Sequence, residues 1–306
     1  MKIIVILFFS MLLALPTYGQ NRETDYLSHV LEKMNAVESV TYHCVKKAWE
    51  PGDKEPVYSV PTEIYEHVNP QDTAVGYSFL CASDKEFRQP LWVYDGTVFA
   101  YIEKEEKEVR IDDFTQKSPL PFRVIMPQAF GCMKSILEYA LNTQDSIVLS
   151  LKDEGKDYLM ELSIHTPYQV EFFGKACYMP QNPYIYDPTS IYKIWISKEN
   201  DMPYRYRREM QHSISEDICS DFVYNPSGKG KIVAEDYYPA DYVRRIKGEK
   251  SQKATVDMTG KKAPDWTLTD MKGQKVSLSG IKSKVILLQF TGIGCGPCKI
   301  SIPFLN

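Results

Sequence analysis

The sequence has few of the features that mark proteins binding nucleic acid or metal, or spanning a membrane. Its 306 residues carry a formal net charge of -4, so it lacks the basic surplus that attracts nucleic acid. The five histidines are scattered without metal-ligand spacing, and no segment after the N-terminus is apolar enough to cross a bilayer. We therefore expect no nucleic-acid partner, no metal site and no cofactor.

The longest apolar run lies at the N-terminus. Lys2 precedes the apolar residues 3–15, and small residues lead to Gly19, which is typical of a secretory signal peptide. A membrane anchor is the alternative, but an apolar run of about 13 residues is shorter than the roughly 20 that cross a bilayer. No cysteine before Cys44 is available to carry a lipid. We expect residues 1–19 to be cleaved and the mature protein to be periplasmic and not lipid-anchored.

The cysteines are odd in number, seven in all. Disulfides persist in oxidising compartments, so at least one thiol is expected to be free, reactive or paired outside this chain. Five cysteines lack metal-ligand spacing, and we expect them to be buried free thiols or members of one or two structural bridges. These five are Cys44, Cys81, Cys132, Cys177 and Cys219.

Residues 20–245 predict a β-rich domain. Apolar side chains recur at helical spacing over 23–37 and 127–141, and Asp95-Gly96 predicts a hairpin turn because glycine readily accepts positive φ. Runs rich in Val, Ile, Tyr, Phe and Thr predict strands at 39–46, 57–68, 74–81, 91–103, 146–152, 158–164, 190–197, 204–210 and 218–224. We expect an α+β fold with a mainly antiparallel, curved, open barrel-like sheet and one or two helices.

The composition changes after Arg244, where charged and small residues accumulate. We expect a linker over 246–261 and a second domain over 262–306. In this second segment, Lys272-Gly273 predicts a turn and the uninterrupted apolar residues 285–290 predict a buried strand.

A Cys295-Gly296-Pro297-Cys298 motif follows that apolar stretch and precedes a predicted helix. A helix N-terminus lowers a thiol pKa from about 8.5 toward 7 or below, and the thiolate is the nucleophile of disulfide exchange. We therefore expect Cys295 to attack and Cys298, one turn inside the helix, to resolve the mixed disulfide. Gly296 allows a partner chain to approach, and Pro297 preorganises the first helical turn.

Other chemistries of two closely spaced cysteines fit the sequence less well. A zinc site lacks a second Cys/His pair, and haem attachment requires His where Lys299 stands. Peroxidase chemistry requires Thr or Ser in place of Gly292. An inert structural bridge is the alternative that stays open.

Residues 263–266 (Ala-Pro-Asp-Trp), the apolar stretch, the Cys-Gly-Pro-Cys motif and residues 302–306 resemble the opening of the TlpA/ResA-like branch of the thioredoxin superfamily. The resemblance implies an incomplete thioredoxin-like α/β domain that reduces protein disulfides and receives electrons from a membrane or periplasmic reductant. Gly294 replaces the Trp usual in that branch. The later strands and the cis-proline loop of the fold are missing, so we expect a truncated form of a longer protein.

Residues 92–96 and 194–197 are similar to strands of LolA/LolB-like carrier domains, which implies a hydrophobic ligand in the β-rich domain. Three functions follow from these observations. Our main prediction is an exported thiol-disulfide oxidoreductase that acts on protein disulfides and dithiols. The alternatives are a carrier of lipid or another hydrophobic ligand with a non-functional redox segment, and an envelope interaction module whose cysteine motif is an ordinary bridge.

Overall fold

The computed structural model describes residues 17–115, 122–181, 187–247, 259–270 and 272–289. The chain divides into two compact units, residues 1–248 and 249–306. No helix within the described ranges is long and apolar enough to cross a membrane.

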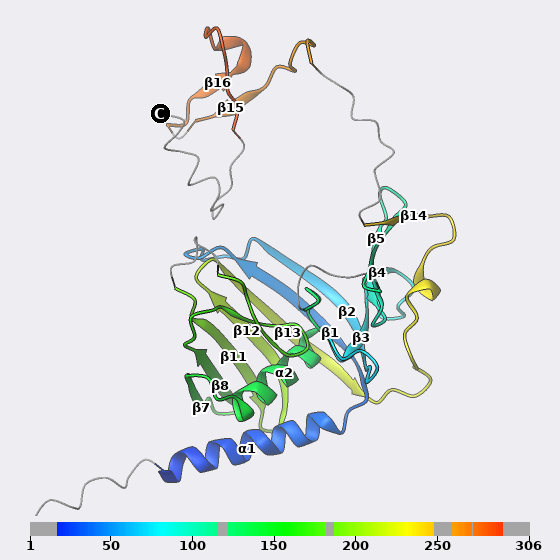
Figure 1. Cartoon of the computed structure of the whole chain (residues 1–306), viewed down its shortest axis with the longest axis vertical. Coiled ribbons are helices and arrows are strands. Elements are labelled where there is room, and N and C mark those ends of the chain that lie inside the picture. Colours follow the sequence, from blue (N-terminus) through cyan, green and yellow to red (C-terminus); the bar gives the residue numbers. More distant parts are fainter. Residues whose placement is uncertain (1–16, 116–121, 182–186, 248–258, 271, 290–306) are drawn as a thin grey trace, which may run out of the picture. The chain divides into compact units, whose positions relative to one another are not determined.

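The larger unit is built on one 12-stranded sheet with two free edges (Figure 1). Its strands are β1 (Ser39–Trp49), β2 (Tyr58–Val68), β3 (Tyr77–Ala82), β4 (Pro90–Tyr94), β5 (Val98–Glu103), β6 (Glu108–Asp113), β7 (Ile147–Asp153), β8 (Asp157–Ile164), β11 (Ser190–Ser197), β12 (Met202–Met210), β13 (Ser213–Tyr224) and β14 (Val243–Ile246). They lie in the order β14-β6-β5-β4-β3-β2-β1-β13-β12-β11-β8-β7. The expected open, antiparallel sheet is confirmed, with the β14–β6 pair as a parallel exception.

The β1–β13 ladder joins the two halves of this sheet. Strands β1 to β6 form one half as a meander, and the other half contains β7, β8, β11, β12 and β13. The small hairpin of β9 (Val170–Phe172) and β10 (Ala176–Tyr178) lies outside this sheet. Because strands distant in sequence meet at β1 and β13, this ladder determines how the halves fit together.

Two helices pack against each other and against β12. Helix α1 (Thr17–Asn35) buries Leu27, Val30 and Met34 completely, as its apolar spacing predicts. Helix α2 (Ala129–Asn142) buries an apolar face that includes Phe130. The sheet also provides a hydrogen-bond acceptor for a backbone amide in the first turn of α2, because the Phe130 amide donates to the Tyr42 hydroxyl at 3.2 Å. Both expected helices are therefore confirmed, and α2 is fixed at its N-terminus by β1.

A second, smaller core lies on the first half of the sheet, around Tyr65, Leu80 and Val93. Ile232, just before the short 3₁₀ helix η1 (Ala234–Tyr237), packs into it and is fully buried. The chain then forms β14, which the composition did not predict. This short strand pairs at the sheet edge, where Arg245 bonds Glu108, so charge pairing replaces the apolar alternation that normally reveals a strand.

The smaller unit has little regular structure in its described residues. Strands β15 (Thr267–Thr269) and β16 (Lys275–Ser277) form a hairpin with the expected turn at Gly273, and the 3₁₀ helix η2 (Leu278–Gly280) follows. Residues 285–289 form no strand, and the side chains of Val285 and Leu287 are 84% and 74% exposed.

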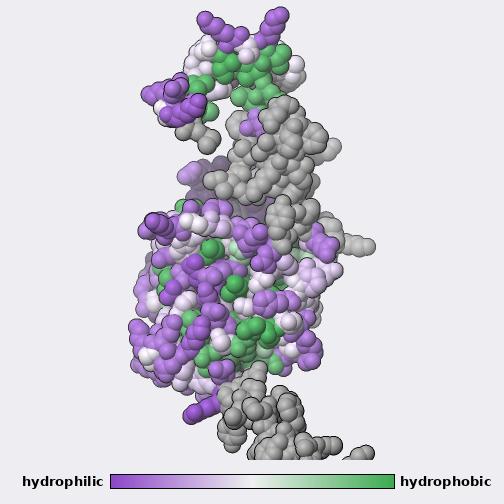
Figure 2. All heavy atoms as spheres, turned by 90° about the vertical axis from the view of Figure 1, so that its left-hand side faces the viewer, coloured by the Kyte–Doolittle hydropathy of each residue, from purple (hydrophilic) through white to green (hydrophobic). Residues whose placement is uncertain are grey.

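The prediction of a buried strand is therefore wrong for 285–289, while Phe290 lies outside the described residues. The physical reason is that an apolar strand is buried only against neighbouring strands and helices, and the described part of this unit pairs none with it. Figure 2 shows hydrophobic residues gathered in this unit. The described residues do not form a thioredoxin-like domain.

Candidate functional site

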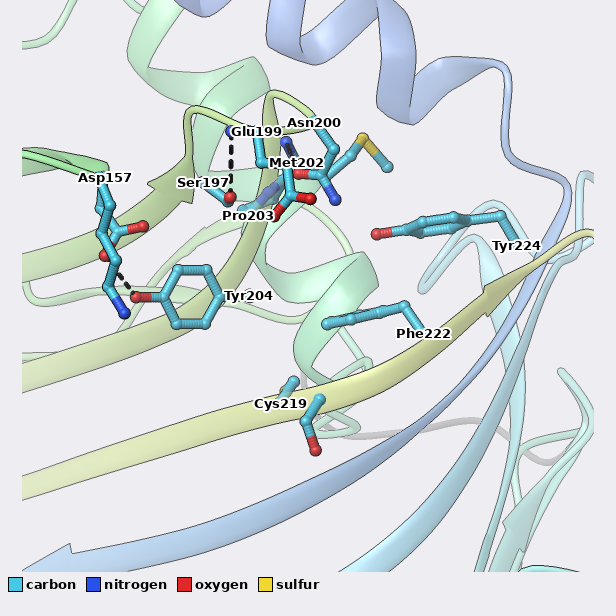
Figure 3. Close-up of a pocket in the computed structure, with 12 residues that line it drawn as sticks. Asp157, Ser197, Glu199, Asn200, Met202, Pro203, Tyr204, Cys219, Phe222 and Tyr224 are labelled. Carbon is cyan, nitrogen blue, oxygen red and sulfur yellow. Dashed lines mark hydrogen bonds between the residues drawn. The ribbon is translucent and has the colours of Figure 1, made fainter.

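A cavity of about 360 Å³ opens beside β12 and β13 in the larger unit. Three segments line it: the β7–β8 hairpin end, the β11–β12 turn and the second half of β13. The lining residues are Lys156, Asp157, Ser197, Glu199, Asn200, Met202, Pro203, Tyr204, Cys219, Ser220, Phe222 and Tyr224. Figure 3 shows Phe222 and Tyr224 projecting from β13 on the side where Met202 lies.

A β-bulge in β13 creates the wall of this cavity. The register with β1 shifts between Thr41 and His43, and Asp221 on the opposite strand has φ of 57°. In a regular strand, alternation would put Cys219 and Phe222 on opposite faces. The extra residue reverses the phase, so both side chains line the same cavity.

Stacked aromatic rings form the apolar wall. The Phe222 ring stacks on Tyr42 with centroids 5.1 Å apart and on Tyr224 with centroids 5.6 Å apart. Tyr224 also contacts Phe130 of α2 at 6.2 Å between centroids. Burial raises the pKa of Tyr224 to about 12, so its hydroxyl stays neutral at physiological pH. The two rings that line the cavity, Phe222 and Tyr224, are therefore apolar except for the neutral Tyr224 hydroxyl.

Polar contacts hold the rim in place. The Tyr204 hydroxyl donates to Asp157 at 2.9 Å, and burial together with this bond raises the pKa of Tyr204 to about 12. From α1, the Lys33 ammonium donates to the Asn200 carbonyl at 2.7 Å and the Tyr26 hydroxyl donates to Asp201 at 3.0 Å. Helix α1 is thereby fastened to the β11–β12 turn that borders the cavity.

A buried polar cluster lies deeper, between the sheet and the N-terminus of α2. Glu66 is 1% exposed and accepts from the Gly131 amide at 3.0 Å. Burial raises the pKa of Glu66 to about 8, so its carboxyl group is mostly protonated at neutral pH. Its second oxygen and the side-chain oxygen of Gln128 have no hydrogen-bond partner within the described structure. No group in the described structure compensates for the burial of these two polar oxygens.

The five scattered cysteines are all buried, and each is a free thiol. Burial raises the pKa of Cys132 to about 12 and raises that of Cys81 and Cys219 well above the ordinary value. Thiols with raised pKa values are poor nucleophiles at neutral pH. Of the two expectations for these residues, the structure shows buried free thiols. Within the described ranges, no group of three or more His, Cys, Asp or Glu could hold a metal ion.

The predicted redox residues Cys295, Gly296, Pro297 and Cys298 lie outside the described residues, so their roles stay predictions. The cavity on β13 was not anticipated from the sequence. The sequence feature that could have indicated it is the spacing of three positions between the apolar residues Cys219 and Phe222. Residues on one face of a regular strand are two positions apart, so this spacing is compatible with a bulge.

Comparison with known proteins gives short sequence matches. No protein-family model matches the chain. The thiol-disulfide oxidoreductase ResA of Bacillus anthracis is 40% identical over 47 residues, which cover 15% of this chain and 27% of that protein. The ResA of Geobacillus kaustophilus is 40% identical over 52 residues, covering 17% and 30%. The matches thus span less than a third of the length of these curated relatives.

Solved structures give distant matches to most of the chain. The Mycobacterium tuberculosis lipoprotein LppX has 7% identity and a TM-score of 0.35, covering 69% of this chain and 99% of its own. A LolA superfamily protein from Nitrosomonas europaea has 10% identity and a TM-score of 0.26, covering 71% and 99%. These TM-scores are too low to assign a fold or a function by comparison.

Proposed function

We propose that the protein is an exported, periplasmic thiol-disulfide oxidoreductase whose redox-active thiols are Cys295 and Cys298. The main support is the 40% identity over 47 residues to the thiol-disulfide oxidoreductase ResA. That length is close to the segment 262–306, which holds the chain's one pair of cysteines separated by two residues. Residues 1–19 support export because they have the pattern of a signal peptide.

The reaction requires two steps at the dithiol. The Cys295 thiolate attacks a protein disulfide, a new S–S bond forms, and the partner's second sulfur leaves as a thiolate that takes up a proton. Cys298 then loses its proton and attacks Cys295 in the mixed disulfide, which releases the reduced partner. The partner gains two electrons and Cys295–Cys298 becomes a disulfide, which a dithiol reductant in or beside the membrane would reduce again.

The larger unit supports a division between reactive and inert thiols. Its five cysteines are buried, and burial raises the pKa of Cys81, Cys132, Cys177 and Cys219. These thiols are expected to react slowly with protein disulfides at neutral pH. Rapid exchange with protein disulfides would therefore be concentrated in the segment that contains Cys295.

Insulin reduction in the presence of dithiothreitol tests this function on the chain from residue 20 to 306. We expect turnover that Cys295→Ser abolishes, whereas Cys298→Ser traps a mixed disulfide. Cys177→Ser is the matched control, because this cysteine is buried in the larger unit and its loss should leave turnover unchanged. Wild-type turnover no faster than Cys295→Ser, with the larger unit folded by circular dichroism, would refute the proposal.

The cavity on β13 supports a second function, the binding of a small molecule with an apolar body and a polar end. Its volume of about 360 Å³ falls within the roughly 300–1,000 Å³ of typical ligand sites. The stacked rings of Phe222 and Tyr224 would contact the apolar part of the ligand. Asp157 and Tyr204 at the rim would contact the polar end.

Titration with a fluorescent fatty-acid analogue tests this second function. Phe222 lines the cavity and is only half-buried, so Phe222→Ala should remove part of the apolar wall while the larger unit stays folded. We expect at least tenfold weaker binding of the analogue. Val223→Ala, at the neighbouring exposed position that does not line the cavity, is the control, and equal binding by both variants would exclude this site.

A further inference from the structure

The β1–β13 ladder places two thiols directly opposite each other. Cys44 and Cys219 are register partners in this antiparallel pair. Opposed residues in antiparallel strands have Cα atoms about 4.5–5.5 Å apart, and disulfides join Cα atoms about 4.4–6.8 Å apart. Both side chains belong to the same buried core, at 0% and 4% exposure. The backbone is therefore already positioned for a bond between them.

We propose that Cys44 and Cys219 form a reversible disulfide across the centre of the sheet, made by exchange with a disulfide compound. Cys219 loses its proton, and its thiolate attacks the compound's S–S bond and releases one sulfur, which takes up a proton. Because burial disfavours the thiolate, this exchange is slow at neutral pH. Cys44 then displaces the second sulfur. Two electrons and two protons pass from the cysteine pair to the compound, which leaves as two thiols. This reaction is independent of the chemistry proposed for Cys295 and Cys298.

The cavity on β13 explains how an oxidant reaches this pair. Cys219 lines the cavity, whereas Cys44 is completely buried. A small disulfide entering the cavity can therefore meet Cys219 first, and Cys44 acts from the opposing strand. The lining residues Glu199 and Asn200 are exposed, so the cavity opens to solvent at the β11–β12 turn.

The other buried cysteines are less well placed to react with this pair. On β2, Thr62 is the register partner of Cys44, while Cys81 of β3 faces Ile64. Cys81 is therefore two strands away from Cys44, and Cys132 lies on α2. Only the Cys44–Cys219 combination consists of opposed positions on paired strands of the described structure.

A bond at this position would lock the two halves of the sheet together. Most of the larger unit lies between Cys44 and Cys219 in the sequence, so the disulfide would close a long loop in the unfolded chain. Long closed loops reduce the entropy of the unfolded state most strongly. The same bond would fix the floor of the cavity at Cys219, which links the redox state to the shape of the ligand site.

Oxidation with glutathione disulfide, alkylation of the remaining thiols and peptide mapping by mass spectrometry test the proposal. We expect a crosslinked peptide pair that contains Cys44 and Cys219. The thermal midpoint of the larger unit should rise by roughly 5–10 °C. The crosslink and the rise should persist in Cys295→Ser, which separates them from the proposed function.

Matched variants identify the residues responsible. Cys44→Ala and Cys219→Ala should each abolish the crosslink and the rise in midpoint, while Cys81→Ala, at a buried position, should keep both. If an alanine variant fails to fold, Cys219→Ser provides a second test. The proposal is wrong if both thiols of the wild type, oxidised while folded and then denatured, are alkylated, or if Cys44 is found crosslinked to another cysteine.

Discussion

The two units of this protein differ in how their apolar residues are used. In the larger unit, strands from distant parts of the sequence pair across one sheet, and apolar residues of α1 and α2 are fully buried. In the described part of the smaller unit, a short hairpin stands alone and Leu287 and Leu288 are exposed. Apolar composition alone therefore does not produce a core, because burial requires several elements that cover one another.

The largest expected difference between the units concerns core truncation. Phe130 is 1% exposed, so Phe130→Ala should lower the free energy of unfolding by about 3–5 kcal/mol. Leu287→Ala removes a side chain that is 74% exposed and should change stability by less than about 0.5 kcal/mol. Urea denaturation followed by circular dichroism measures both. Equal losses would show that Leu287 is buried in solution and would remove the contrast.

Charge pairs provide a second comparison, within the larger unit. Arg208 bonds Glu171 through two nitrogens, and both side chains are largely buried. Arg208→Met leaves Glu171 without its cationic partner and should cost about 3 kcal/mol of unfolding free energy. Lys85→Met breaks an exposed pair with Asp221 and should have no measurable effect in the same urea titration. A small effect at Arg208 would contradict the buried pair.

The two units also differ in how closely other atoms surround a glycine that has positive φ. Gly174 has φ of 83°, and an added Cβ would lie 2.0 Å from the Val75 carbonyl oxygen. Gly273 has φ of 79°, and an added Cβ would have no atom of the described residues within 4 Å. Gly174→Ala should therefore cost more than about 2 kcal/mol through strain plus overlap, and Gly273→Ala about 1 kcal/mol through strain alone. Thermal melts of both variants measure the two losses of stability. Equal losses would show that the close contact at Gly174 adds nothing to the strain.

The last effect, small over any single pH unit, is a dependence of stability on pH. Burial raises the pKa of Glu66 from 4.5 to about 8, so between these values the folded protein binds more protons than the unfolded chain. This group's contribution is complete below pH 4.5 and is lost as the pH rises toward 8, by at most about 1.4 kcal/mol per unit. Glu66→Gln should flatten this part of a stability profile measured by urea titration. An unchanged slope would contradict the buried, protonated carboxyl group.

Local patterns identified most elements of the larger unit. The helix expected at 127–141 corresponds to α2 (Ala129–Asn142), and the run at 190–197 to β11 (Ser190–Ser197), because side-chain periodicity directly reflects one-sided burial. Edge strand β14 escaped detection, because its stability comes from pairing with β6 and from charges. The apolar stretch at 285–289 produced the opposite error, a predicted buried strand that the structure does not contain. Apolar composition does not reveal whether other strands or helices are present to cover it.

The sequence by itself determined most of the secondary structure of the larger unit and the presence of the Cys295-Gly296-Pro297-Cys298 motif, because both depend on residues close together in the chain. Only the tertiary structure decided that Cys44 faces Cys219 and that a bulge turns Phe222 into the same cavity. The physical reason is that strand register depends on pairing between distant segments. A shift of one residue would move these side chains to opposite faces of the sheet.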